Sequence, residues 1–127
     1  MSYRKLKADY LFDGFEMYLD SVLICLQDGT IEAIVDEKQA GDDLEKFSGI
    51  ICPGFINCHC HLELSHLKGL IPEKQGLVNF VLSVVNSRNQ PEELKQEAIR
   101  SAESEMLEAG IVAVGDICNT SDTLVLK

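Results

Sequence analysis

Residues 53–61 read Pro-Gly-Phe-Ile-Asn-Cys-His-Cys-His and follow the apolar run Gly-Ile-Ile-Cys at residues 49–52. Apolar and β-branched residues bounded by glycine and polar residues predict a buried strand that ends at the histidines. Side chains alternate along a strand, so His59 and His61 are expected on the same face, with Cα atoms about 6.6 Å apart. Both rings could then reach one ion at about 2.0–2.1 Å per nitrogen. The spacing predicts a metal-binding pair.

Residues 53–61 resemble the Pro-Gly-Phe-Ile-Asn-x-His-x-His signature that ends the first barrel strand in metal-dependent amidohydrolases, notably the deaminase and chlorohydrolase branch. The resemblance extends more loosely to the N-terminal segment and to residues 110–116, which look like a second barrel strand. It implies an α/β fold in two domains. An N-terminal β-rich (composite sandwich) subdomain is expected at residues 1–52, and the first βα units of a (β/α)8 TIM barrel at residues 53–127.

The resemblance also implies a metal-dependent hydrolase that deaminates or hydrolyses a C–N bond of a heterocyclic small molecule. Hydrolytic dechlorination and amide cleavage are chemical relatives of this reaction. The expected cofactor is a divalent metal held by His59 and His61, zinc in the first place, with iron, nickel or manganese as alternatives. The ion would activate a water molecule, and a separate acid/base residue would protonate the departing ammonia. No such acid/base residue is identifiable in the sequence.

The stretch after the pair, His61-Leu62-Glu63-Leu64-Ser65, is similar to the aminodeoxyfutalosine deaminase subgroup, which acts in menaquinone biosynthesis. It would form the first βα loop, where barrel enzymes place groups that contact substrate. Glu63, Ser65 and His66 are therefore the candidates for substrate contact. The alternative is a capping or loop role for Glu63 and Ser65 and simple solvent exposure for His66.

A (β/α)8 barrel needs about 250 residues, so 127 residues are expected to hold only its opening. The family usually adds two more histidines and an aspartate from later strands, whereas His66 is the one other histidine here. The chain alone is therefore expected to be inactive and to bind metal weakly. It is also expected to self-associate or to be partly disordered in isolation, because the helix stripe at residues 77–85 and the edge of the second strand would be exposed.

The composition of the chain indicates which kinds of molecule it could bind. The formal net charge of −10, from 21 acidic and 11 basic residues, opposes binding to nucleic acid or anionic membranes and leaves a small-molecule substrate, with a homo-oligomer also possible. Neither an apolar span of about 18 residues nor a signal peptide is visible, which favours a cytoplasmic protein. Five cysteines, an odd number, fit reduced thiols better than a disulfide framework.

Periodicity predicts the elements on either side of the pair. Residues 3–35 alternate short apolar runs with Asp-Gly turns, which predicts a β meander, and residues 36–46 read as a surface loop. A period of about 3.6 predicts one helix over residues 77–85 and a second from Pro91 to Gly110. The apolar stripe of the second helix consists of Leu94, Ala98, Ala102 and Met106.

Two other classes of protein remain open. A non-catalytic zinc-binding module could use Cys52, Cys58 and Cys60 with the histidines, although strand alternation would send Cys58 and Cys60 to the face opposite the imidazoles. The simpler interpretation is that these cysteines pack as small apolar residues, as Cys25 would. An interaction or regulatory module, completed by a partner chain, is the second alternative. Asp116, at the end of a predicted strand, could face the mouth of the site but is expected to serve as a turn or cap residue. Cys118 and Asn119, one step further into the same loop, are treated in the same way.

Overall fold

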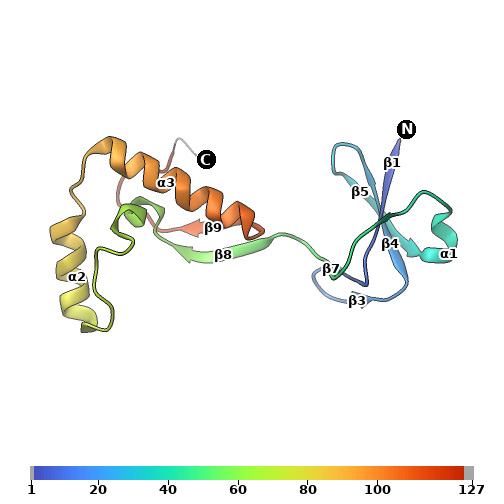
Figure 1. The fold of residues 1–127 in the computed structure, drawn as a ribbon, viewed down its shortest axis with the longest axis horizontal. Helices are drawn as coiled ribbons and strands as arrows, with labels where there is room; N and C mark the ends of the chain where they lie inside the picture. Colours follow the sequence, from blue (N-terminus) through green and yellow to red (C-terminus); the bar gives the residue numbers. More distant parts are fainter. Residues whose placement is uncertain (1, 125–127) are drawn as a thin grey trace. The chain divides into compact units, whose positions relative to one another are not determined.

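The computed structural model describes residues 2–124. Figure 1 follows its mixed α/β elements along the chain. The chain divides into two compact units, Met1–Pro53 and Gly54–Lys127. The first unit is β-rich, and the second carries the histidine pair.

The first unit contains two sheets. One has the strand order β5-β4-β1-β6 and the other the order β3-β2-β7. The first sheet comprises β1 (Tyr3–Lys7), β4 (Ser21–Leu26), β5 (Ile31–Asp36) and β6 (Glu45–Lys46); the second comprises β2 (Tyr10–Phe12), β3 (Met17–Tyr18) and β7 (Ile50–Ile51). The strands are therefore not a single meander as predicted, because β1 pairs with β4 rather than with β2. The predicted turn at Asp28-Gly29 is confirmed, since Gly29 has a φ of 90° and Leu26 N–H donates to the Thr30 carbonyl.

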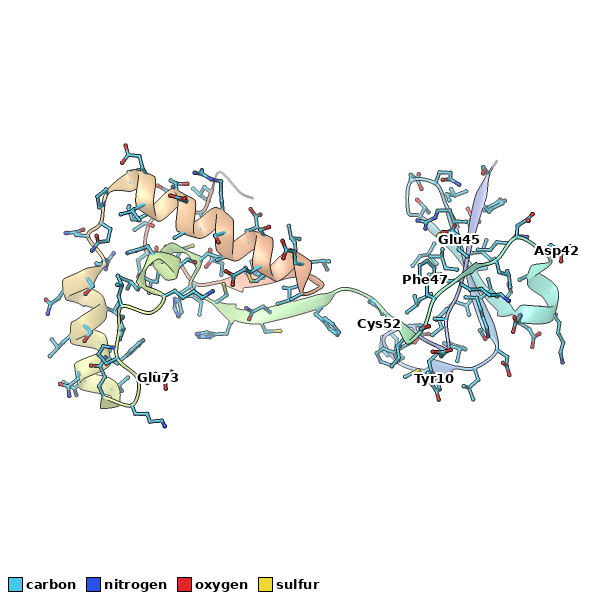
Figure 2. The ribbon with its side chains drawn as sticks, in the orientation of Figure 1. Tyr10, Asp42, Glu45, Phe47, Cys52 and Glu73 are labelled. Carbon is cyan, nitrogen blue, oxygen red and sulfur yellow. The ribbon has the colours of Figure 1, made fainter. Side chains whose placement is uncertain are left out.

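Part of the segment at residues 36–46, expected to be a loop, forms a short helix and a short strand. Asp36 caps a short helix, α1 (Glu37–Ala40), by accepting a hydrogen bond from Lys38 N–H. Strand β6 then pairs in parallel with β1. The Arg4 guanidinium meets the Glu45 carboxylate through two hydrogen bonds of 3.0 and 2.7 Å, and Figure 2 labels Glu45 on this sheet. The polar composition of the segment gave no indication of these contacts, because they join residues 41 positions apart in the sequence.

The second unit begins with β8 (Phe55–Cys60), followed by the 3-10 helix η1 (Leu62–Leu67), α2 (Gly76–Ser87), α3 (Glu92–Glu108) and β9 (Ile111–Asp116). Both predicted helices and the strand at residue 111 are confirmed. Gly110 has a φ of 78°, as expected of a residue that ends a helix in the left-handed region. Strands β8 and β9 are parallel, and α3 packs on η1 and β9 with Ile99 fully buried.

The single buried strand predicted across residues 50–61 is wrong. Ile50 and Ile51 form β7 and pair with β2 in the first unit, residues 52–54 are not in a strand, and β8 starts afresh at Phe55. Pro53 has no N–H to donate to a ladder, which explains a break at this point. Nor is the start of β8 buried, because Phe55 is 60% exposed and Ile56 is 65% exposed.

Helix α2 exposes its apolar side chains, as the sequence predicted. The exposed fractions are 77% for Leu77, 47% for Phe80, 47% for Val81 and 57% for Val85. Together with Val84, which is half-buried, these residues form the predicted stripe. Val78 and Leu82, which lie outside the stripe, are exposed as well. Exposed apolar area of this kind on one helix is a surface on which other protein can pack.

Candidate functional site

The two histidine rings lie next to each other at the end of β8. Their centroids are 5.1 Å apart, and the ring planes make an angle of 75°. Rings whose nitrogens each lie about 2.0–2.1 Å from one tetrahedral ion have centroids about 5 Å apart. The spacing therefore fits two imidazoles that share one ion.

Strand β8 contains a bulge at Cys58 and His59, so the first histidine of the pair lies within it. Asn57 is opposite Val114 and Cys60 is opposite Asp116, so three steps along β8 match two steps along β9. A bulge adds one residue to a strand and changes which way the following side chains point. Asn57 lies near Met106 of α3, and both Cys60 and His61 line a groove against the same helix. The strict alternation used in the sequence-based prediction does not hold from Asn57 to Cys60. The expected closeness of the His59 and His61 rings is nevertheless found.

Gly115 lies opposite this bulge. A Cβ atom added to Gly115 would lie 2.6 Å from the carbonyl oxygen and 3.0 Å from the carbonyl carbon of Cys58. Because these are backbone atoms, they cannot move aside as the end of a flexible side chain could. Glycine at this position therefore permits the close approach of the two strands beside the histidines.

His61 makes a hydrogen bond that leaves one ring nitrogen available. Its Nδ1 lies 2.8 Å from the carbonyl oxygen of Ile117. A carbonyl can only accept, so this contact requires a proton on Nδ1, and in the neutral ring Nε2 is then the atom with a lone pair. Metal-bound histidines commonly donate their other N–H to a backbone carbonyl, which orients the ring.

The segment after β9 is attached to the end of β8 by two further hydrogen bonds. Ile117 N–H donates to the Cys60 carbonyl at 2.8 Å, and Leu62 N–H donates to Asp116 Oδ1 at 3.0 Å. Leu62 is the first residue of η1, so the Asp116 carboxylate caps that helix. This agrees with the turn or cap role expected for Asp116.

Glu63 lies in η1 and is 3% exposed. Its Oε1 accepts a hydrogen bond from the Asn119 side-chain amide at 3.0 Å. Its Oε2 accepts three more, from Asn119 N–H, Thr120 N–H and the Thr120 hydroxyl, each at 2.8 Å. Burial raises the pKa of a carboxyl, but these hydrogen bonds outweigh it and hold the Glu63 pKa below its ordinary value. Both carboxylate oxygens are thus occupied within the protein, and contact of Glu63 with substrate stays a prediction.

Ser65 and His66 differ in their remaining hydrogen-bonding capacity. The Ser65 hydroxyl donates to the Leu62 carbonyl at 2.7 Å, whereas Nδ1 and Nε2 of His66 are both buried without a hydrogen-bond partner among residues 2–124. Both residues line a groove of about 670 Å³ between η1 and α3. A buried imidazole without a partner is unfavourable, so His66 has unused capacity for a ligand or a water molecule.

No group of three or more His, Cys, Asp or Glu side chains within residues 2–124 is placed to hold a metal ion. His59 and His61 are brought together, while the Glu63 carboxylate accepts hydrogen bonds from Asn119 and Thr120. The alternative four-ligand Cys/His module therefore has no assembled cluster in the described residues.

Sequence reasoning missed the contributions of Ile117, Asn119 and Thr120. The signal available was their position directly after the second parallel strand, since the carboxyl ends of neighbouring parallel strands lie at the same edge of a sheet. That rule predicts proximity to His61 and Glu63. It does not predict a backbone carbonyl as the partner of His61, because every residue has one.

Comparison with known proteins gives one finding on identity. The model of the Amidohydrolase family matches residues 50–127, which is more than half of the chain. The search among curated proteins returned no significant match.

Across the part of the chain that the structure describes, each helix is too short or too polar to cross a membrane.

Proposed function

The chain belongs to the amidohydrolase family, and from that premise we propose that it forms part of a metal-dependent hydrolase in which His59 and His61 hold the ion. The observation that carries the proposal is the 5.1 Å separation of the two ring centroids. The hydrogen bond from Nδ1 of His61 to Ile117 supports it, since it leaves Nε2 to face an ion.

The residues present fit a divalent ion, and proteins of this family generally bind one. Two neutral imidazoles suit zinc first, then iron, nickel or manganese. When bound, such an ion supplies a hydroxide nucleophile by lowering the pKa of a water molecule toward 7. His59 and His61 would hold and orient the ion, and Asp116 and Ile117 would keep the end of β8 in place through Leu62 and His61.

A catalytic zinc ion usually has three protein ligands and one open position, so His59 and His61 require at least one further ligand. We propose that it comes from outside residues 2–124, from later strands of a TIM barrel in which β8 and β9 are the first two. Parallel sheets are normally covered on both faces, whereas Ile56 and Val112 are each 65% exposed here. On this proposal the chain by itself is inactive and binds metal weakly.

The proposed reaction is removal of an amine from, or hydrolysis of a C–N bond in, a heterocyclic small molecule. The acidic balance of the chain is compatible with a small molecule and unfavourable for nucleic acid. His66 and Ser65 are the proposed substrate contacts in η1, because both line the groove against α3 and neither ring nitrogen of His66 has a hydrogen-bond partner among residues 2–124. For Glu63 the four hydrogen bonds to Asn119 and Thr120 favour a different role.

Cobalt substitution tests the ligand set. Cobalt is titrated into the wild-type chain, into His59→Ala and His61→Ala, and into a Cys58→Ser/Cys60→Ser variant, which serves as the matched control. We expect weak nitrogen and oxygen ligation that either histidine variant removes and the double cysteine variant retains. A thiolate charge-transfer band that disappears in the cysteine variant would instead favour the zinc-binding module, and submicromolar stoichiometric binding by the chain alone would contradict the proposed incomplete shell.

A further inference from the structure

Glu63 joins two loops that lie at the ends of neighbouring parallel strands. It belongs to η1, two residues after His61, while its hydrogen-bond donors Asn119 and Thr120 lie 56 and 57 positions further along the chain. Two of the donors are backbone N–H groups and two are side-chain groups. The carboxylate therefore fixes the main chain of the 119–120 segment as well as its side chains.

The same segment holds His61. Ile117 lies two residues before Asn119, and its carbonyl oxygen is the acceptor for Nδ1 of His61. The N-terminal side of Ile117 is held by the Cys60 carbonyl, and the C-terminal side is held by Glu63. The Ile117 carbonyl is thus held in place on both sides along the chain, and Glu63 provides the contact on the C-terminal side.

We propose that Glu63 is a positioning residue for the His59–His61 pair, which holds the Ile117 carbonyl against Nδ1 of His61 and so keeps Nε2 of His61 directed to the metal. This inference rests on the proposed function for its metal, and on the structure alone for the link from Glu63 to His61. It assigns Glu63 an indirect role, in which the carboxylate contacts neither the ion nor the substrate.

The chemistry of the contact explains why a carboxylate is needed. Oε2 accepts three hydrogen bonds, and an ionised carboxylate has acceptor sites on both oxygens. In a Glu63→Gln variant, one of the two positions becomes an amide NH2. That group is a donor and would face donors of Asn119 or Thr120 in either orientation of the amide. The substitution keeps the shape of the side chain and removes part of its acceptor capacity.

The test measures the His61 ring in the full chain without metal. Histidine is labelled with 15N, and long-range correlation spectra at about pH 8.5, where exposed imidazoles are neutral, report which ring nitrogen carries the proton. Wild-type chain is compared with Glu63→Gln and with Thr120→Val, which removes a hydroxyl donor from the other end of the contact. Glu105→Gln is the matched control, because Glu105 is an exposed carboxylate of the same unit that pairs with Lys68 instead.

We expect His61 to be protonated at Nδ1 in wild type and in Glu105→Gln, and to shift toward the Nε2–H form in Glu63→Gln and, to a smaller extent, in Thr120→Val. Zinc added to the same samples should bind His61 about 10-fold more weakly in Glu63→Gln than in wild type. A folded Glu63→Gln chain with an unchanged His61 ring overturns the inference. If Glu63→Gln fails to fold, an unchanged ring in folded Thr120→Val overturns it equally.

The two readouts separate this inference from the proposed function. The protonation of the ring needs no metal, so it decides the link from Glu63 to His61 in either case. If zinc perturbs the rings of His59 and His61 in no sample, the proposed metal role fails, and with it the part of the inference that concerns the metal.

Discussion

Nδ1 of His61 lies 2.8 Å from the carbonyl oxygen of Ile117, a residue 56 positions away in the sequence. The contact joins the end of one parallel strand to the loop that follows its neighbour. It sets the orientation of the second imidazole of the pair, as outer hydrogen bonds do for metal ligands in general. On the role proposed for Glu63, the residues that surround Ile117 affect a site that they do not touch.

Asp116→Ala should destabilise the second unit by about 1 kcal/mol, because it removes the acceptor for Leu62 N–H at the start of η1. Urea unfolding of the chain measures the change. Glu97→Ala, at an exposed position of α3, is the control and should change the free energy of unfolding by less than about 0.5 kcal/mol. Equal stability of Asp116→Ala and wild type would show that the carboxylate does not cap η1.

Gly115→Ala should cost about 1–3 kcal/mol, since the added Cβ would lie 2.6 Å from the Cys58 carbonyl oxygen and would push β8 and β9 apart. Gly54→Ala offers a comparison, because its Cβ would lie 2.5 Å from both Cγ atoms of the Val112 side chain. Thermal unfolding of the variants provides the measurement. Val112→Ala should rescue Gly54→Ala and leave Gly115→Ala unrescued; rescue of both would mean that the backbone can adjust.

The Lys95 ammonium, 2.8 Å from Asp122 Oδ2, holds the pKa of the Asp122 carboxyl below its ordinary value. A carboxyl with a lowered folded-state pKa contributes stability that is present above its unfolded pKa and is lost as the pH falls through the folded-state value. Asp122→Asn should therefore lower stability at neutral pH, by about 1 kcal/mol at most for this partly exposed pair, and flatten the loss of stability on acidification. Unfolding measured from pH 7 down to about pH 3 tests this, and an unchanged pH profile would rule it out.

The exposed stripe on α2 should drive self-association of the chain. Leu77→Glu combined with Val81→Glu places two charges on that stripe, where the side chains are 77% and 47% exposed, and should shift the chain toward monomer. Sedimentation velocity at several concentrations gives the oligomeric state. Asn86→Glu, which adds a charge at an exposed polar position of the same helix, should leave association close to wild type. A wild-type chain that stays monomeric at all concentrations would contradict the prediction.

Sequence alone determined the features that depend on neighbouring residues. The adjacency of His59 and His61 follows from the geometry of two residues in extended backbone, and the turn at Asp28-Gly29 follows from the positive φ that glycine accepts. Helices α2 and α3 were predicted because a period of 3.6 residues is a local property. Each of these features depends only on residues a few positions apart in the sequence.

Tertiary structure decided what depends on register between distant segments. The bulge at Cys58 and His59 exists because β8 has one residue more than β9 between two paired positions, and neither strand reveals this by itself. The strand predicted as continuous is broken at Pro53, and Ile50 and Ile51 pair with β2 instead of continuing into β8. Glu63 could be identified as a candidate from its place after the pair, but its four donors come from residues 119 and 120, and only the pairing of β8 with β9 brings them within hydrogen-bonding distance.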